Sequence, residues 1–220
     1  MKQPTPPHGN DEPDPGFMPL AEGAALVDIA SEADAELGPF LEVGSYRGRS
    51  ASYLGPVARQ LGTVLFCVDD HRHEEEGAPN WRRPRSKDTA QDVVGLDDTL
   101  PVFRRTMAEA ELEDAVVPIV GESSTVAKFW DRGLSLLFLN GGRSVEEVQA
   151  DYSGWVNKVA VGGLLIINDV IIDADEDELA TYEHLYLPVR DSGEFEEVRA
   201  VGSLRILCRL SEPKRMTPVR

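Results

Sequence analysis

The chain alternates between two patterns of apolar residues. Five short, continuous apolar runs, typical of strands buried on both faces of a sheet, lie at residues 40–43, 64–68, 116–120, 134–139 and 164–167. Before and between them, apolar residues three or four positions apart predict helices at residues 20–37, 50–61, 97–112, 124–130 and 145–159. Buried strands that alternate with helices predict a doubly wound, Rossmann-like α/β domain with a parallel sheet.

The end of the chain departs from this alternation. Residues 195–200 and 203–210 are strand-like and are separated only by Val201 and Gly202, so they can pair only as an antiparallel hairpin. The third apolar run contains Pro118, which predicts an edge strand because proline has no N–H for the ladder. The predicted sheet therefore has five parallel strands followed by a C-terminal antiparallel hairpin.

Polar segments mark the limits of the domain. Residues 1–19 combine six prolines with acidic residues and predict a flexible arm, because they offer little apolar area to bury. We expect the domain to span residues 20–212 and a short tail to follow at 213–220.

An internal polar stretch, residues 71–95, is longer than a usual connection between a strand and a helix. Asp97 after it is a helix N-cap signal. Within the stretch, Trp81 stands beside Arg82, Arg83 and Arg85, which suggests a site for an anionic or sugar-like substrate; a mobile, solvated loop is the alternative.

Charge and composition exclude some classes of binding partner. The chain has 22 Lys and Arg against 39 Asp and Glu, a net charge of −17 that repels nucleic acids and anionic membranes. The longest apolar run, Val159–Ile167, is far shorter than the roughly 20 residues that span a bilayer, and no apolar stretch follows Lys2. We therefore expect no membrane partner, no secretory signal and a cytoplasmic protein, with Cys67 and Cys208 as reduced core residues.

The most informative segment is FLEVGSYRGRS, in which a strand ends on Gly44 and a helix begins just after Gly48. Gly44 permits a tight turn, and we expect Gly48 to let a ligand approach the backbone closely. The helix N-terminus favours a ligand with an anionic group. The spacing differs from G-x-G-x-x-G, which disfavours a dinucleotide.

With this loop, three further segments, VLFCVDD, LSLLFLNGGRSVEEVQADYSGW and GGLLIINDV, resemble the class I S-adenosylmethionine-dependent methyltransferases. The chain looks most like the bacterial small-molecule group that includes cephalosporin-biosynthesis and sugar O-methyltransferase-like proteins, over about residues 20–210. The resemblance implies S-adenosylmethionine as the cofactor and the strand order 3-2-1-4-5-7-6.

The resemblance also implies roles for individual residues. The methionine portion of the cofactor would be surrounded by Glu42, Gly44, Ser45 and Gly48. Asp69 would accept hydrogen bonds from the ribose hydroxyls, because a carboxylate offers paired acceptors; alternatively, Asp69 is a solvated acid and Asp70 takes this role. The adenine edge would meet Gly121, Glu122 and Ser123, and Asn140 completes the predicted cofactor site.

The fourth and fifth strands depart from the pattern of the relatives. Relatives tend to read F-I-D-G-x-H after the fourth strand, where this chain has Asn140 and Arg143 in place of the aspartate and histidine. The fifth strand ends on Asn168 and Asp169, so only Asp169 is charged among the candidate metal ligands. Because Mg²⁺ needs carboxylate charge to offset its dehydration, we expect no divalent metal.

Methylation of a hydroxyl also needs a group that accepts or stabilises charge, and His71, Arg143 and Asp169 are the candidate catalytic residues. Arg143 stays protonated, so it would stabilise an alkoxide or hold an anionic substrate, or else pair with nearby glutamates. His71 lies at the carboxyl edge of the predicted sheet and is the alternative base, unless it is a loop histidine with no further role.

Three functions remain open. The first is methyl transfer to a hydroxyl group of a small molecule, such as a sugar or a specialised metabolite, by a protein that is a monomer or a homodimer. The second is a non-catalytic module that binds the cofactor or its product, which the loss of the Asp and His favours. The third, a dinucleotide-dependent oxidoreductase, is opposed by the glycine spacing.

Overall fold

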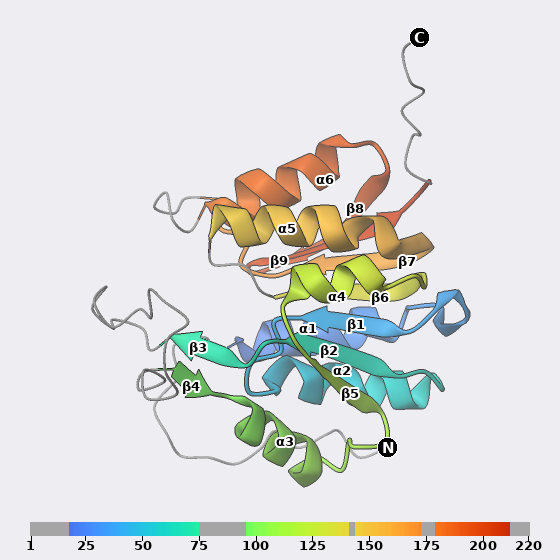
Figure 1. Ribbon diagram of the computed structural model, residues 1–220. Helices are drawn as coiled ribbons and strands as arrows, with labels where there is room; N and C mark the ends of the chain where they lie inside the picture. The colour runs from blue at the N-terminus through green and yellow to red at the C-terminus, as the bar shows by residue number, and fades with distance from the viewer. Residues whose placement is uncertain (1–17, 75–95, 141–143, 173–178, 212–220) are drawn as a thin grey trace.

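A seven-stranded sheet forms the centre of the computed structural model, which describes residues 18–74, 96–140, 144–172 and 179–211. The order of the strands is β5-β2-β1-β6-β7-β9-β8 (Figure 1). They comprise β1 (Phe40–Val43), β2 (Leu65–Asp69), β5 (Val116–Val120), β6 (Leu134–Leu139), β7 (Val159–Ile167), β8 (Phe195–Val201) and β9 (Leu204–Arg209). The first five are parallel and the last two form the antiparallel hairpin, so the predicted order 3-2-1-4-5-7-6 is confirmed.

Helices cover both faces of this sheet (Figure 1). One face packs on α1 (Leu20–Ala30), α2 (Arg49–Gln60) and α3 (Leu100–Glu109), and the other on α4 (Ser123–Phe129), α5 (Val145–Trp155) and α6 (Leu187–Asp191). The continuous apolar runs feed both cores, because alternate strand residues face opposite ways. In β6, Leu136 and Phe138 enter the core under α1 and α2, whereas Leu137 and Leu139 enter the core under α4 and α5.

Several element boundaries differ from the prediction. The first helix ends at Ala30, and a separate 3-10 turn, η1 (Ala35–Leu37), precedes β1. The helix expected from 97 begins at Leu100, because residues before it form β4 (Leu96–Asp98), which pairs with β3 (Arg72–Glu74). The predicted Asp97 cap is wrong: Asp98 Oδ1 accepts the Leu100 N–H instead.

The second half of the domain also holds elements that the pattern did not separate. α5 gives way to a 3-10 turn, η3 (Val156–Lys158), and β7 begins five residues before the expected strand. A π-helical turn, η4 (Tyr182–Tyr186), leads into α6, where no element was predicted. Pro118 lies in the edge strand β5, as expected.

The structure also bears on three further predictions, which concern the N-terminal arm, the two cysteines and the absence of a membrane-spanning helix. Met18, assigned to the flexible arm, is 7% exposed and packs in the core, whereas residues 1–17 and the tail from 212 lie outside the described residues. Cys67 and Cys208 are free thiols on β2 and β9, four strand steps apart, as predicted. Among the described helices, none is long and apolar enough to cross a membrane.

Candidate active site

The glycine loop joins β1 to α2 at the carboxyl edge of the sheet. Gly44 has φ 82° and Gly48 has φ 85°, a region that favours glycine, and Tyr46 between them adopts φ 46°. The Gly48 N–H donates to the carbonyl of Ser45 at 2.8 Å. The predicted tight turn from strand to helix is therefore present.

The close approach at Gly48 comes from the protein itself. A Cβ at this position would lie 2.9 Å from Met107 Cε and 3.0 Å from Phe103 Cδ2, both on α3. The sequence could show that a small residue was needed here but not which group would come close. Gly48 permits α3 to pack on the loop. The space beside its Cα is therefore occupied by α3, whereas the sequence predicted a ligand there.

Asp69, at the end of β2, faces the glycine loop. Its Oδ2 accepts the N–H of Tyr46 at 2.8 Å, and its Oδ1 accepts the N–H of His71 at 2.7 Å. Asp70 is turned elsewhere, with Oδ1 accepting the N–H of Arg72 at 3.0 Å. Of the two acids considered for the ribose, Asp69 is therefore the one beside the loop.

Glu42 lies beneath the loop and is 0% exposed. Ser50 Oγ donates to its Oε1, and Cys67 Sγ lies 3.4 Å from its Oε2. The pKa of this carboxyl is raised from 4.5 to about 7, chiefly by burial and to a smaller extent by the charge of Asp69, while the hydrogen bonds from Ser50 and Cys67 lower it. Glu42 is thus brought to the loop as predicted, but its carboxyl faces Ser50 and Cys67.

Ser45 Oγ and His71 Nε2 are buried polar atoms near Asp69 that have no hydrogen-bond partner among the described residues. His71 is 2% exposed, adopts φ 57°, and hydrogen-bonds through Nδ1 to Thr99 Oγ1 at 2.9 Å. Buried polar groups almost always have a partner in a folded protein. A polar ligand bound in this loop could supply the missing hydrogen-bond partners of the Ser45 hydroxyl and the His71 ring nitrogen.

Two asparagines stand where the next strands end. Asn140 Nδ2 donates to the carbonyl of Gly44 at 3.2 Å, and Asn168 Nδ2 donates to Asn140 Oδ1 at 2.7 Å. Asp169 follows as an exposed residue with φ 55°. Arg143, the other departure from the relatives, lies outside the described residues.

Comparison with known proteins agrees with this geometry. Residues 41–170 match a family model described as a methyltransferase domain. The chain belongs to this methyltransferase family. The match confirms the predicted class, the S-adenosylmethionine-dependent methyltransferases, and removes the oxidoreductase alternative.

Solved structures with the same fold are distant in sequence. A Corynebacterium glutamicum protein is 16% identical with a TM-score of 0.64, over 93% of this chain and 85% of that one. The O-methyltransferase NovP is 15% identical with a TM-score of 0.61, over 87% and 81%. The methyltransferase PaMTH1 of Podospora anserina, solved with S-adenosylhomocysteine, is 11% identical with a TM-score of 0.59, over 89% and 81%. At these identities the likeness shows a shared fold.

The three residues predicted to contact adenine in this methyltransferase have different surroundings. The Gly121 N–H donates to the carbonyl of Asp69 at 3.0 Å, and the exposed Glu122 is the N-cap residue of α4. The Ser123 hydroxyl instead donates to Asp151 at 2.6 Å and accepts from Trp155 Nε1 at 2.7 Å. The side chain of Ser123 thus joins α4 to α5, and its hydroxyl keeps one acceptor lone pair for the predicted contact.

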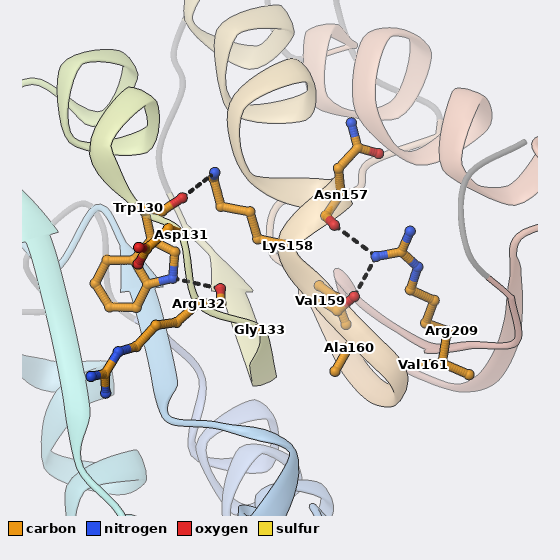
Figure 2. Close-up of a pocket in the computed structure, with 10 residues that line it drawn as sticks. All are labelled: Trp130, Asp131, Arg132, Gly133, Asn157, Lys158, Val159, Ala160, Val161 and Arg209. Carbon is orange, nitrogen blue, oxygen red and sulfur yellow. Dashed lines mark hydrogen bonds between the residues drawn. The ribbon is translucent and has the colours of Figure 1, made fainter. Parts of the chain in front are cut away.

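A cavity of about 300 Å³ lies at the opposite edge of the sheet, before β6 and β7 begin (Figure 2). Two of the cations that line it are hydrogen-bonded to the main chain: Lys158 Nζ donates to the carbonyl of Trp130 at 2.7 Å, and the buried Arg209 donates to those of Asn157 and Val159. Ligands of open α/β sheets bind at the carboxyl ends of the strands. The glycine loop, at the carboxyl edge, therefore remains the candidate site, and this cavity lies at the other edge.

Proposed function

We propose that this methyltransferase transfers the methyl group of S-adenosylmethionine to a hydroxyl group of a small molecule. The observation that carries the proposal is the glycine loop at the carboxyl edge, where two buried polar atoms near Asp69 have no hydrogen-bond partner among the described residues. The O-methyltransferase fold relatives support a hydroxyl as the target.

In this proposal Asp69 binds the ribose. Its carboxylate already accepts the N–H groups of Tyr46 and His71, but a carboxylate has about four lone-pair sites and so can also accept from two hydroxyls. Ser45 Oγ lies in the loop where the methionine portion would bind. S-adenosylmethionine supplies a methyl group on a positively charged sulfur: the new O–C bond forms as the C–S bond breaks, and the sulfur keeps the electron pair.

The substrate hydroxyl loses its proton, and among the predicted catalytic residues we assign this proton to Asp169. It is exposed and follows Asn168 directly at the carboxyl edge. The His71 ring is buried, bonded to Thr99 and packed 5.4 Å from the Phe103 ring centroid, so it suits a ligand-binding role better than a base for an incoming substrate.

The arrangement of Asn140 and Asn168 also bears on whether the site could bind a divalent metal ion. Both the nitrogen and the oxygen of the Asn140 amide are hydrogen-bonded to protein groups, and the acid that follows Asn168 directly in the sequence is Asp169. Among the described residues, no group of three or more His, Cys, Asp or Glu is placed to hold a metal ion. These residues do not fit a hard cation, so the proposed reaction is assigned no metal step.

A second function, a non-catalytic module that binds S-adenosylmethionine or S-adenosylhomocysteine, is favoured by the same asparagine pair. An amide pair held by the protein can support the cofactor loop without assisting proton removal, since an amide is not a base near neutral pH. The two functions agree on the cofactor and differ only in turnover.

Calorimetric titration with S-adenosylhomocysteine tests the shared part. We expect micromolar affinity for the wild type and a loss of roughly 1 to 3 kcal/mol in Asp69→Asn, the cost typical of leaving ligand groups unpaired. Asp70→Asn is the matched control and should bind like the wild type, because Asp70 is turned to Arg72. Equal affinities in all three proteins would remove Asp69 from the site.

Methyl transfer to a panel of hydroxylated acceptors then separates the two functions. Release of S-adenosylhomocysteine with an acceptor present supports the enzyme, and we expect EDTA to leave that rate unchanged. Tight binding without turnover across the panel favours the binding module instead.

A further inference from the structure

A chain of side-chain hydrogen bonds crosses the carboxyl edge from the glycine loop to α1. The carbonyl of Gly44 accepts from Asn140 at 3.2 Å, and Asn140 accepts from Asn168 at 2.7 Å. The Ser203 hydroxyl shares its one proton between two acceptors, Asn168 Oδ1 at 3.3 Å and Glu22 Oε1 at 3.0 Å. Five residues that are dispersed along the sequence thus form one connected path.

The direction of these hydrogen bonds follows from their first member. The carbonyl of Gly44 can only accept, so Asn140 must present its nitrogen there and its oxygen to Asn168. Asn168 must then present its nitrogen to Asn140, and its oxygen to Ser203. Reversing either amide would place two oxygens together, so each asparagine has a single favourable orientation.

Glu22 anchors the far end. It lies in the first turn of α1 and is only 5% exposed. Its Oε1 also accepts the Ser203 N–H at 2.6 Å, which fixes the turn between β8 and β9. Gly202 in that turn has φ 56°, and a Cβ there would overlap the Glu22 carboxylate. The carboxylate therefore occupies a site shaped to receive it.

We propose that Glu22 and Ser203 are positioning residues for the cofactor loop and act through Asn168 and Asn140 on the carbonyl of Gly44. In a planar trans peptide the C=O and the next N–H point in opposite directions. Holding the Gly44 carbonyl toward Asn140 therefore turns the N–H of Ser45 the other way and fixes the loop that receives the methionine portion. This inference rests on the proposed function, because that function places the cofactor at this loop.

Calorimetric titration with S-adenosylhomocysteine tests the path at Ser203, which touches neither the loop nor the proposed ligand. We expect Ser203→Ala to bind roughly three- to tenfold more weakly than the wild type, the range for one lost hydrogen bond. Ser203→Thr keeps the hydroxyl and should keep the affinity. A second variant, Glu22→Gln, should weaken binding in the same direction, because it removes the charged acceptor.

The matched control is Ser192→Ala, at the opposite end of β8. Its hydroxyl also makes two hydrogen bonds, donating to the carbonyl of Val189 at 2.7 Å and accepting the N–H of Glu194 at 3.0 Å. We expect it to lower the melting temperature as Ser203→Ala does while leaving the affinity unchanged. This separates a positioning effect from a general loss of stability.

A double-mutant cycle completes the test. If the path acts as a unit, Ser203→Ala combined with Asn140→Ala should weaken binding by less than the product of the two single effects. Wild-type affinity in Ser203→Ala, or fully independent effects in the cycle, would overturn the positioning role while leaving the proposed function intact. A wild-type protein that does not bind S-adenosylhomocysteine would instead overturn the proposed function, and this inference with it.

Discussion

At the scale of single residues, two of the buried acids of this methyltransferase, Glu42 and Asp151, show how burial changes the pKa of a carboxyl. Glu42 lies under the cofactor loop with its pKa raised to about 7, and Asp151 lies between α4 and α5 with its pKa raised from 3.8 to about 6, in both cases chiefly by burial. Each carboxyl has a hydroxyl partner, Ser50 for Glu42 and Ser123 for Asp151. Among the described residues, no cation contributes to the pKa of either carboxyl, so burial favours the neutral form of each.

These pKa values predict how stability depends on pH. A carboxyl whose pKa is raised on folding binds more protons in the folded state, so its contribution is complete below about pH 4.5 and is lost as pH rises through about 7. We expect the melting temperature to fall from pH 5.5 to pH 8, with Glu42 adding a slope of up to about 1.4 kcal/mol per pH unit. Thermal unfolding of Glu42→Gln should show a shallower dependence.

Glu36→Gln provides the control, because Glu36 is an exposed carboxylate on η1 and its loss should leave the pH dependence unchanged. If Glu42→Gln keeps the full wild-type slope, Glu42 is not the group that titrates.

At the scale of elements, the position of α3 depends on the glycine loop. Phe103 and Met107 pack against Gly48, and Thr106 Oγ1 donates to the carbonyl of Arg47 at 2.9 Å. Thr99, which precedes α3, bonds to the His71 ring and so links the helix to the end of β2. A substitution in the loop should therefore shift α3, and a substitution in α3 should shift the loop.

Gly48→Ala measures this dependence. Alanine at φ 85° carries strain, and its Cβ would crowd Phe103 and Met107, so we expect a loss of about 2 to 4 kcal/mol in the free energy of unfolding. Gly62→Ala is the matched control, since Gly62 has φ 72° but open space around it, and should cost only about 1 to 2 kcal/mol. If denaturant titration gives the same loss of unfolding free energy for both variants, α3 can move away from the added methyl group at no cost in stability.

At the scale of the whole molecule, the parallel sheet and the acidic surface act in opposite directions on stability. Two apolar cores on either side of the sheet hold the chain together, while a net charge of −17 disfavours the compact state through self-repulsion. Ion pairs of the described residues, such as Arg59 with Asp114 and Arg199 with Glu32, lie at the surface and contribute little to stability.

Salt should therefore stabilise the protein. Raising NaCl from about 0.01 M to about 0.15 M shortens the Debye length from about 30 Å to about 8 Å and weakens the repulsion among the acids. We expect the melting temperature at pH 7.5 to rise by several degrees over this range. A fall would mean that favourable ion pairs outweigh the net charge.

The sequence by itself determined the sheet, because its signals are local. Continuous apolar runs such as Leu134–Leu139 can be buried only between two helical layers, and two glycines after the first strand fix a tight turn. A hairpin follows from the short turn between the last two strands. The ribose-binding role expected of Asp69, with Asp70 as the alternative, came from the resemblance to the methyltransferase family and not from these local signals.

Only the tertiary structure decided which groups meet. The pairing of β3 with β4 joins residues on either side of a long segment, and the hydrogen bonds of Glu22 to Ser203 join residues 181 positions apart, for which one sequence carries no periodic signal. The structure likewise assigned the space at Gly48 to α3 and turned the Ser123 hydroxyl toward α5. Local patterns fix backbone conformation and burial, whereas the partner of a buried polar or small residue is set by packing between distant elements.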